Sequence, residues 1–76
     1  MKAVNVYFPT MDSVKDFVNC VSRYPYEIDL HSGRYVVDAK SLLGIFSLDL
    51  SKPIACEIYN DKCDDLIKDI NKYIAK

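Results

Sequence analysis

The sequence predicts an α+β fold of order β-α-β-β-α-β-α, an open-faced β-sandwich with three helices on one face of a four-stranded, mostly antiparallel sheet. Two observations predict it. Segments that alternate in polarity or are rich in β-branched and aromatic residues occur at 2–8, 27–31, 34–37 and 54–59, as is typical of strands. Amphipathic segments with the period of a helix separate and follow them. Strands with one apolar face need a cover, which the helices provide.

In the first strand, residues 2–8, one face is more apolar than the other, and it is formed by Val4, Val6 and Phe8. Pro9 ends it because proline donates no backbone hydrogen bond. The next helix has three candidate N-caps, Thr10, Asp12 and Ser13. Its apolar residues recur at helical spacing and end before Pro25; they are Val14, Phe17, Val18 and Val21.

The middle of the chain predicts a β-hairpin followed by a short helix. Ser32-Gly33 supplies the turn between the strands at 27–31 and 34–37. Ser41 stands directly before an apolar run, which is an N-cap signal and places a helix at about 42–48.

The last third of the chain predicts a strand and a longer helix. Pro53 opens the strand at 54–59, and Asn60 or Asp61 is expected to cap the helix. The helix has the cleanest amphipathic stripe in the chain, formed by Cys63, Leu66, Ile67, Ile70, Tyr73 and Ile74.

Composition narrows the class of protein. The 76 residues predict a single domain, 1–76, and 50% hydrophobic with 28% charged residues is typical of a folded chain. The net charge of −1 argues against nucleic-acid binding and electrostatic membrane attachment. No segment resembles a signal peptide or a membrane span. Cys20, Cys56 and Cys63 lack disulfide or zinc spacing, which predicts reduced thiols in a cytoplasmic protein.

Residues 38–48, DAKSLLGIFSL, resemble the regulatory-serine segment of HPr, the histidine-containing phosphocarrier of the bacterial sugar phosphotransferase system. In that family a Lys-Ser pair precedes two apolar residues, often a glycine, two more apolar residues and Ser/Thr-Leu. The resemblance covers about residues 14–74, and its specific part is the dozen residues around Ser41. It implies the HPr fold, with Ser41 as the serine that a metabolite-responsive kinase phosphorylates. It also implies an apolar surface for protein partners, formed by Leu42, Leu43 and Phe46.

One segment departs from that family. HPr proteins carry a Gly-x-His-x-Arg-Pro segment between the first strand and first helix, where this chain has residues 9–13, PTMDS. Thr10 falls at the place of the histidine and Asp12 at that of the arginine. A threonine does not replace an imidazole as the phosphoryl acceptor at neutral pH, and the aspartate repels a phosphoryl group. The sequence therefore argues against ordinary phosphocarrier activity.

The only histidine, His31, lies at a strand end beside a turn, which is typical of a solvated surface residue. Five apolar residues lie within 42–48, more than one short helix buries on a single sheet face. We expect Ile45 and Leu48 to point inward and Leu42, Leu43 and Phe46 to be partly exposed, which is typical of a contact surface. Ser41 is a helix cap in any case, and phosphorylation there is electrostatically compatible with the helix start.

Three functions are consistent with these residues. The first is a non-catalytic, HPr-like regulatory or partner-binding protein controlled by phosphorylation of Ser41, with phosphotransferase-system components or an HPr serine kinase as partners. The second is a phosphocarrier that uses a non-standard acceptor, His31 being the available imidazole. The third is a structural or oligomerisation module with an inherited HPr fold. The sequence shows no phosphate loop, nucleophile–base pair or metal-ligand cluster, so it predicts neither an enzyme nor a cofactor or metal.

Overall fold

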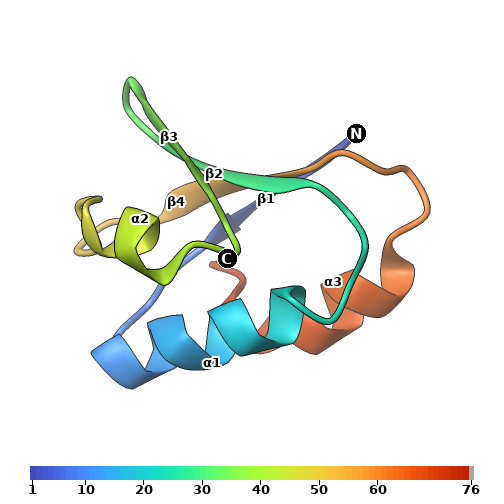
Figure 1. Cartoon of the computed structure of the whole chain (residues 1–76), viewed down its shortest axis with the longest axis horizontal. Coiled ribbons are helices and arrows are strands. Elements are labelled where there is room, and N and C mark those ends of the chain that lie inside the picture. Colours follow the sequence, from blue (N-terminus) through green and yellow to red (C-terminus); the bar gives the residue numbers. More distant parts are fainter. Residues whose placement is uncertain (76) are drawn as a thin grey trace.

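The computed structural model describes residues 1–75, and its helices lie on one face of a single sheet (Figure 1). The predicted α+β open-faced sandwich is therefore confirmed. The elements along the chain are β1 (Lys2–Val6), α1 (Met11–Val21), β2 (Ile28–Ser32), β3 (Tyr35–Asp38), α2 (Leu42–Phe46), β4 (Ile54–Ile58), α3 (Asp64–Ile70) and a closing 3-10 helix, η1 (Asn71–Tyr73).

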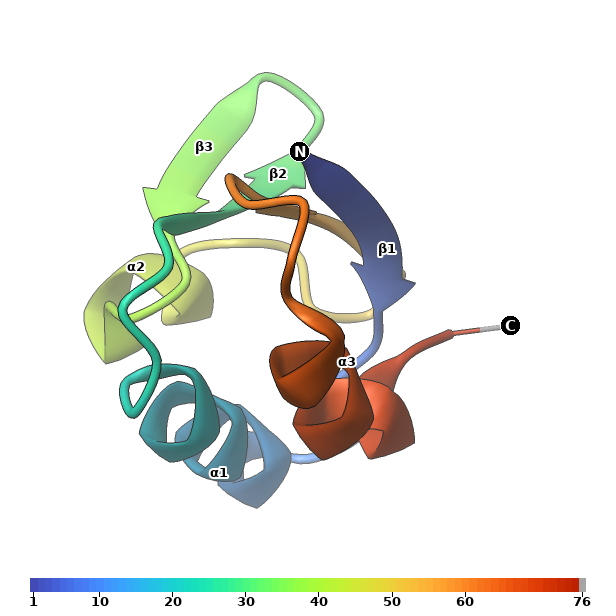
Figure 2. The ribbon, with the colours of Figure 1, turned by 90° about the vertical axis from the view of Figure 1, so that its right-hand side faces the viewer.

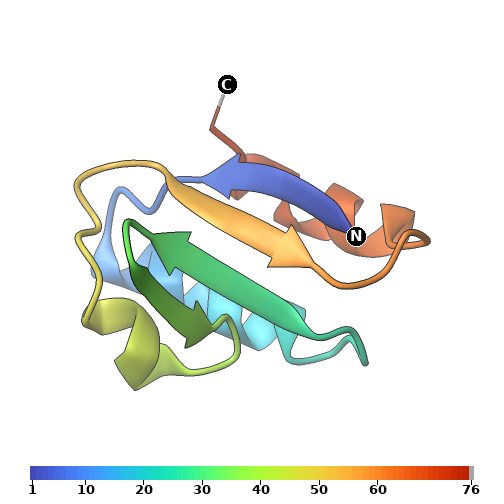
Figure 3. The ribbon, with the colours of Figure 1, turned by 90° about the horizontal axis from the view of Figure 1, so that it is seen from above.

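The sheet has the order β1-β4-β2-β3, and every pair of neighbouring strands is antiparallel. β1 and β3 therefore form its two edges, as Figure 3 shows from above. The two-residue turn between β2 and β3 places Gly33 at a φ of +60°. A positive φ at the first central residue is the geometry of a type II′ turn, which favours glycine and matches the twist of the flanking strands.

The core lies between the sheet and the helices (Figure 2). Alternate strand residues point into it, and the predicted apolar face of the first strand is confirmed because Val6 and Phe8 are buried and Val4 is half-buried. Helices α1 and α3 contribute the apolar stripes that the sequence predicted. Their fully buried members are Val14, Phe17, Val21, Leu66 and Ile70.

Helix α1 begins at Met11 because Thr10 caps it, as one of the three predicted alternatives. The Thr10 hydroxyl accepts a hydrogen bond from Ser13 N at 3.1 Å, and Ser13 Oγ accepts one from Thr10 N at 3.2 Å. This reciprocal capping box satisfies two backbone donors at the helix start.

The predicted cap of the last helix is wrong. Asn60 instead accepts a hydrogen bond from Lys62 N at 2.8 Å, which forms a turn, and the N-cap position falls to Cys63 without a side-chain hydrogen bond. The helix is also shorter than its stripe predicts, because α3 ends at Ile70 and the chain tightens into η1. The stripe still faces inward, since Cys63 and Tyr73 are buried at its two ends.

Two tyrosines join the segment before β2 to α3. Tyr26 donates hydrogen bonds to the Asp65 carboxylate and to Lys62 O, each at 3.1 Å, and Tyr24 donates to the Asp69 carboxylate. The bond to Asp69 raises the pKa of Tyr24 to about 12. The Tyr26 contacts hold the start of α3, and the Tyr24 contact holds its last turn. No helix within residues 1–75 is long and apolar enough to cross a membrane.

Candidate functional site

Ser41 stands at the start of α2 with its side chain turned toward the first turn of the helix. Its backbone is extended, with φ −104° and ψ 104°, and its Oγ accepts a hydrogen bond from Gly44 N at 3.2 Å. Its carbonyl accepts a hydrogen bond from Ile45 N at 3.1 Å. The predicted N-cap at Ser41 is therefore confirmed. Ser41 is also exposed, so its hydroxyl is open to solvent.

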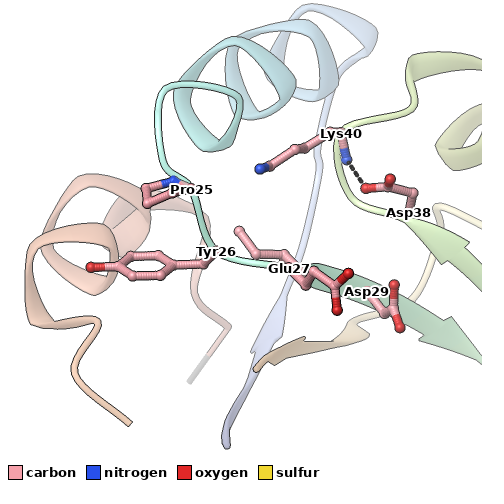
Figure 4. Close-up of a pocket in the computed structure, with 7 residues that line it drawn as sticks. Pro25, Tyr26, Glu27, Asp29, Asp38 and Lys40 are labelled. Atoms are coloured by element: carbon pink, nitrogen blue, oxygen red, sulfur yellow. Dashed lines mark hydrogen bonds between the residues drawn. The ribbon is translucent and has the colours of Figure 1, made fainter. Parts of the chain in front are cut away.

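The segment before Ser41 is held in place by hydrogen bonds to Asp38 and to the segment that follows α1 (Figure 4). The Asp38 carboxylate accepts a hydrogen bond from Lys40 N at 2.8 Å, and Ser41 N donates to Asp38 O at 3.0 Å. The Lys40 ammonium donates to Tyr24 O at 2.7 Å and so reaches back to the segment that follows α1. A hollow of about 300 Å³ lies here, and Lys40, Asp38 and Glu27 contribute to its lining. The position of Ser41 is thus set by tertiary contacts as well as by its helix.

The side chains of α2 divide between the core and the surface. Ile45 is completely buried, and Leu48, just beyond the helix, is 7% exposed. Leu43 is 83% exposed, whereas Leu42 and Phe46 are half-buried and pack against the core. The expected division of inward and outward residues is confirmed, and Leu43 is the residue that projects furthest into solvent. The helix ends at Phe46, earlier than the predicted residue 48.

Gly44 lets α2 approach the sheet closely. A Cβ at this position would lie 3.2 Å from Val37 Cβ and 3.2 Å from Ser41 Oγ, which is tighter than ordinary contact. The glycine therefore serves both the packing of α2 on β3 and the capping bond of Ser41.

The start of α1, residues 9–13, contains no histidine, and its hydroxyl groups are engaged locally. Thr10 occupies the cap, and its hydroxyl is engaged by Ser13 N. Ser13 Oγ also donates to Thr10 O at 2.5 Å, so both hydroxyls are used within the helix start. Asp12 lies in the first turn, where its charge opposes the binding of an anion.

His31 is not a free surface histidine, which corrects the sequence interpretation. Its side chain is 31% exposed, and Nε2 lies 2.6 Å from the Glu57 carboxylate on β4. His31 stands directly opposite Ala55, so Glu57 is its diagonal neighbour across the β2–β4 pair. The histidine also lines an open hollow of about 750 Å³ to which Arg34 and Lys52 contribute. Sequence reasoning missed Glu57 because only the register of two distant strands brings it to His31.

Within residues 1–75 the structure shows no group of three or more His, Cys, Asp or Glu side chains arranged to hold a metal ion. The three cysteines are free thiols, with Cys56 and Cys63 buried and Cys20 half-buried. Burial raises the pKa of the Cys56 thiol to about 12. The cysteines therefore contribute to packing and bring no chemistry to the α2 region.

Comparison with solved structures identifies the fold as that of HPr phosphocarrier proteins. HPr-C-His from Thermoanaerobacter tengcongensis matches with a TM-score of 0.78 and 24% sequence identity, over 95% of this chain and 89% of that chain. Phosphocarrier protein HPr from Bacillus anthracis matches with a TM-score of 0.68 and 20% identity, over 97% of this chain and 94% of that chain. No protein-family model and no curated protein sequence matches the chain. The chain therefore has the HPr fold.

Proposed function

We propose that this protein is a non-catalytic, HPr-like regulatory protein that binds a protein partner through α2, under the control of phosphorylation at Ser41. The binding surface, here named the α2 surface, consists of Leu42, Leu43 and Phe46. The observation that carries the proposal is the 83% exposure of Leu43, two residues after an exposed Ser41. An apolar side chain this exposed does not contribute to the core, and it is available for contact with a partner.

The start of α1 supports a role other than ordinary phosphotransfer. The two hydroxyls of its capping box already bond to the backbone, and Asp12 places a negative charge beside them. A carrier needs a nucleophile there that attacks phosphorus and a cation that holds the product. Residues 9–13 supply neither, which supports the proposal of a function at α2.

Phosphorylation of Ser41 is compatible with the local structure. A phosphate retains acceptor oxygens for Gly44 N, so α2 keeps its cap while gaining close to two negative charges. A partner that prefers the phosphorylated form would therefore present Arg or Lys beside an apolar pocket for Leu43. Among proteins known to bind HPr, phosphotransferase-system components and an HPr serine kinase are the partners to test first.

The first experiment is intact-mass spectrometry of the full chain after incubation with ATP and an HPr serine kinase. We expect the mass of one phosphoryl group, stable to acid and mapped to Ser41, and no added mass in Ser41→Ala. Unmodified wild-type protein in the presence of a kinase that modifies a control HPr would refute control at Ser41.

The second experiment tests the α2 surface with a matched pair of substitutions. Leu43→Lys introduces a charge at the centre of the surface, and Tyr59→Lys introduces the same charge after β4, at the opposite end of the sheet (Figure 1). Tyr59 is 44% exposed, so both variants are expected to fold. Binding to purified phosphotransferase-system proteins should fall at least about tenfold in Leu43→Lys alone. Equal affinity of the two variants would contradict the proposal.

Phosphotransfer through His31 is a second candidate, favoured by its contact with Glu57. Nε2 is buried and lies 2.6 Å from the Glu57 carboxylate, so Nδ1 is the ring nitrogen left to attack phosphorus. Arg34 and Lys52 line the same hollow and would balance the charge of the product. Incubation with phosphoenolpyruvate and the first enzyme of the phosphotransferase system should then give an acid-labile phosphate that His31→Ala abolishes. Absence of that phosphate eliminates this candidate and leaves the α2 proposal intact.

A further inference from the structure

The two edges of the sheet differ in how they are covered (Figure 3). At the β1 edge, the chain after α3 returns and forms an antiparallel bridge between Val6 and Ile74. Tyr7 N donates to Tyr73 O, and Ala75 N donates to Asn5 O, each at 2.8 Å. At the other edge, β3 has no strand beside it other than β2 within the part of the chain that is described. One edge is thus partly closed by the protein's own chain, and the other is open.

The open edge presents unpaired backbone groups. Ala39 N donates to Ile28 O at 2.9 Å, and hydrogen-bonded pairs alternate along an antiparallel ladder. Tyr35 and Val37 therefore direct their backbone groups toward β2, whereas Val36 and Asp38 direct theirs away from it. The Asp38 carbonyl is already bonded to Ser41 N, so the groups left without a partner among residues 1–75 are the Asp38 N–H and both groups of Val36.

The side chains of this edge are apolar and exposed. Tyr35 is 67% exposed and Val36 is 54% exposed. Edge strands are commonly protected by short length, charged side chains, proline or a bulge. β3, with the sequence YVVD, is short and has one charged residue, Asp38 at its end, but it carries no lysine, proline or bulge. Helix α2 packs on β3 from the helix side, where Gly44 approaches Val37 (Figure 2). The edge itself is available to another strand.

We propose that β3 pairs with β3 of a second copy of this chain, antiparallel about a twofold axis at Val36. Val36 then lies opposite the partner's Val36, and their N–H and C=O groups form two hydrogen bonds. Each Asp38 N–H donates to the partner's Arg34 carbonyl, which adds two more. The two four-stranded sheets become one continuous eight-stranded sheet.

The side chains fit this register. Directly opposite residues share a face of an antiparallel sheet, so Tyr35 meets the partner's Val37, an aromatic and β-branched pair. Arg34 meets the partner's Asp38 on the other face, an opposite-charge pair. Two neighbouring registers also keep the faces aligned. One is centred on Tyr35 and places Val36 opposite Arg34. The other is centred on Val37. It places Val36 against a carboxylate, which makes it the poorer choice.

A row of carboxylates lies on the outer face of the sheet, the face away from the helices. This row favours a second copy of the chain as the binding partner of the β3 edge. Asp29 lies directly opposite Asp38 on one side and directly opposite Glu57 on the other. Like charges in such pairs destabilise a sheet. The row ends at the β3 edge, where the partner's Arg34 would extend it with a guanidinium. An extended peptide of another protein would supply the backbone bonds but not this cation in register.

Sedimentation equilibrium and amide hydrogen exchange of the full chain test the dimer. We expect the mass to rise from 8.7 kDa toward twice that value as the concentration approaches about 1 mM. The amides of Val36 and Asp38 should become protected over the same range, while those of Tyr35 and Val37 are protected at every concentration. Val36→Lys places two ammonium groups together on the twofold axis and should weaken association at least about tenfold. Ala3→Lys, the same charge on an exposed residue of β1, should not.

A monomer throughout that range with rapidly exchanging Val36 and Asp38 amides would overturn the proposal. Protection of these amides that needs an added peptide, without any increase in the mass of the protein, would also overturn it and assign the edge to a different partner. Association that Ala3→Lys weakens as much as Val36→Lys would place the interface elsewhere. None of these results depends on the α2 surface, because Val36→Lys leaves Leu43 in place.

Discussion

Replacing Ser41 by alanine should destabilise the protein by about 1 kcal/mol, within the usual range for loss of an N-cap. The substitution removes the Oγ that accepts from Gly44 N at 3.2 Å, and it leaves that donor without a protein partner. The cost is not larger, because the Ser41 carbonyl still accepts from Ile45 N and Ile45 remains buried. For a domain of this size, 1 kcal/mol corresponds to a decrease in Tm of roughly 4–8 °C.

Urea unfolding followed by far-ultraviolet circular dichroism measures this free energy, provided that the slope with denaturant is unchanged. Ser41→Asp should remain within a few tenths of a kcal/mol of wild type, since aspartate caps helices about as well as serine. Ser22→Ala is the matched control, because Ser22 is exposed and its hydroxyl makes no hydrogen bond within residues 1–75. Equal losses in Ser41→Ala and Ser41→Asp would refute the capping role. If Ser41→Asp is as stable as wild type, a change in its affinity for a partner cannot be attributed to a folding defect.

Three further predictions concern the turn, the core and the thiols. Gly33→Ala should cost about 1 kcal/mol by urea unfolding. No atom would lie within 4 Å of the added Cβ, so the loss measures backbone strain at the positive φ. Phe17→Ala should cost about 3–5 kcal/mol and leave little folded protein by circular dichroism, because the ring is completely buried and contacts two other rings. Burial raises the Cys56 pKa from 9.0 to about 12, so the unfolded thiol ionises first and stability should fall between pH 9 and 12. The urea midpoint measured at pH 8 and pH 10 checks this, and alkylation at pH 8 should reach Cys20 well before Cys56.

The faces of the strands and helices were predictable because they depend on local periodicity. Val6 and Phe8 share a face of the first strand whatever packs against it, and both are buried. The apolar residues of the last helix likewise share one face, and Cys63 and Tyr73 at its two ends are buried. The short helix at α2 was predictable from two local signals together, the Ser41 cap and the apolar run after it.

The start of the last helix was not predictable from such signals. Asn60 is a strong local hydrogen-bonding residue, and the sequence could not distinguish its use as a helix cap from its use in a turn. In the structure the turn prevails, and Tyr26 reaches across to bind Lys62 O. That tyrosine lies 36 residues earlier in the chain, so the boundary of α3 is decided by a tertiary contact.

The His31–Glu57 contact was missed for a related reason. Neither residue carries a local signal, and their meeting requires the order β4-β2 and the register that sets Asp29 opposite Glu57. The open β3 edge likewise follows from the strand order alone, since the sequence of β3 resembles that of any half-buried strand. Sites that arise between strands distant in sequence thus depend on topology, whereas caps and stripes do not.

The connection between β1 and α1 is held by contacts within the chain itself. Phe8 lies two residues after the end of β1 and packs against the rings of Phe17 and Tyr73, with centroids 5.0 and 6.0 Å away. Thr10 then begins α1 within two residues, because its capping box with Ser13 satisfies the helix start from inside the chain. A ligand is therefore not needed to pair those backbone donors, and the short connection between strand and helix is stable as it stands. Leu43 of α2 and Val36 of β3 are among the exposed apolar side chains of the protein, and these two elements are where we place binding.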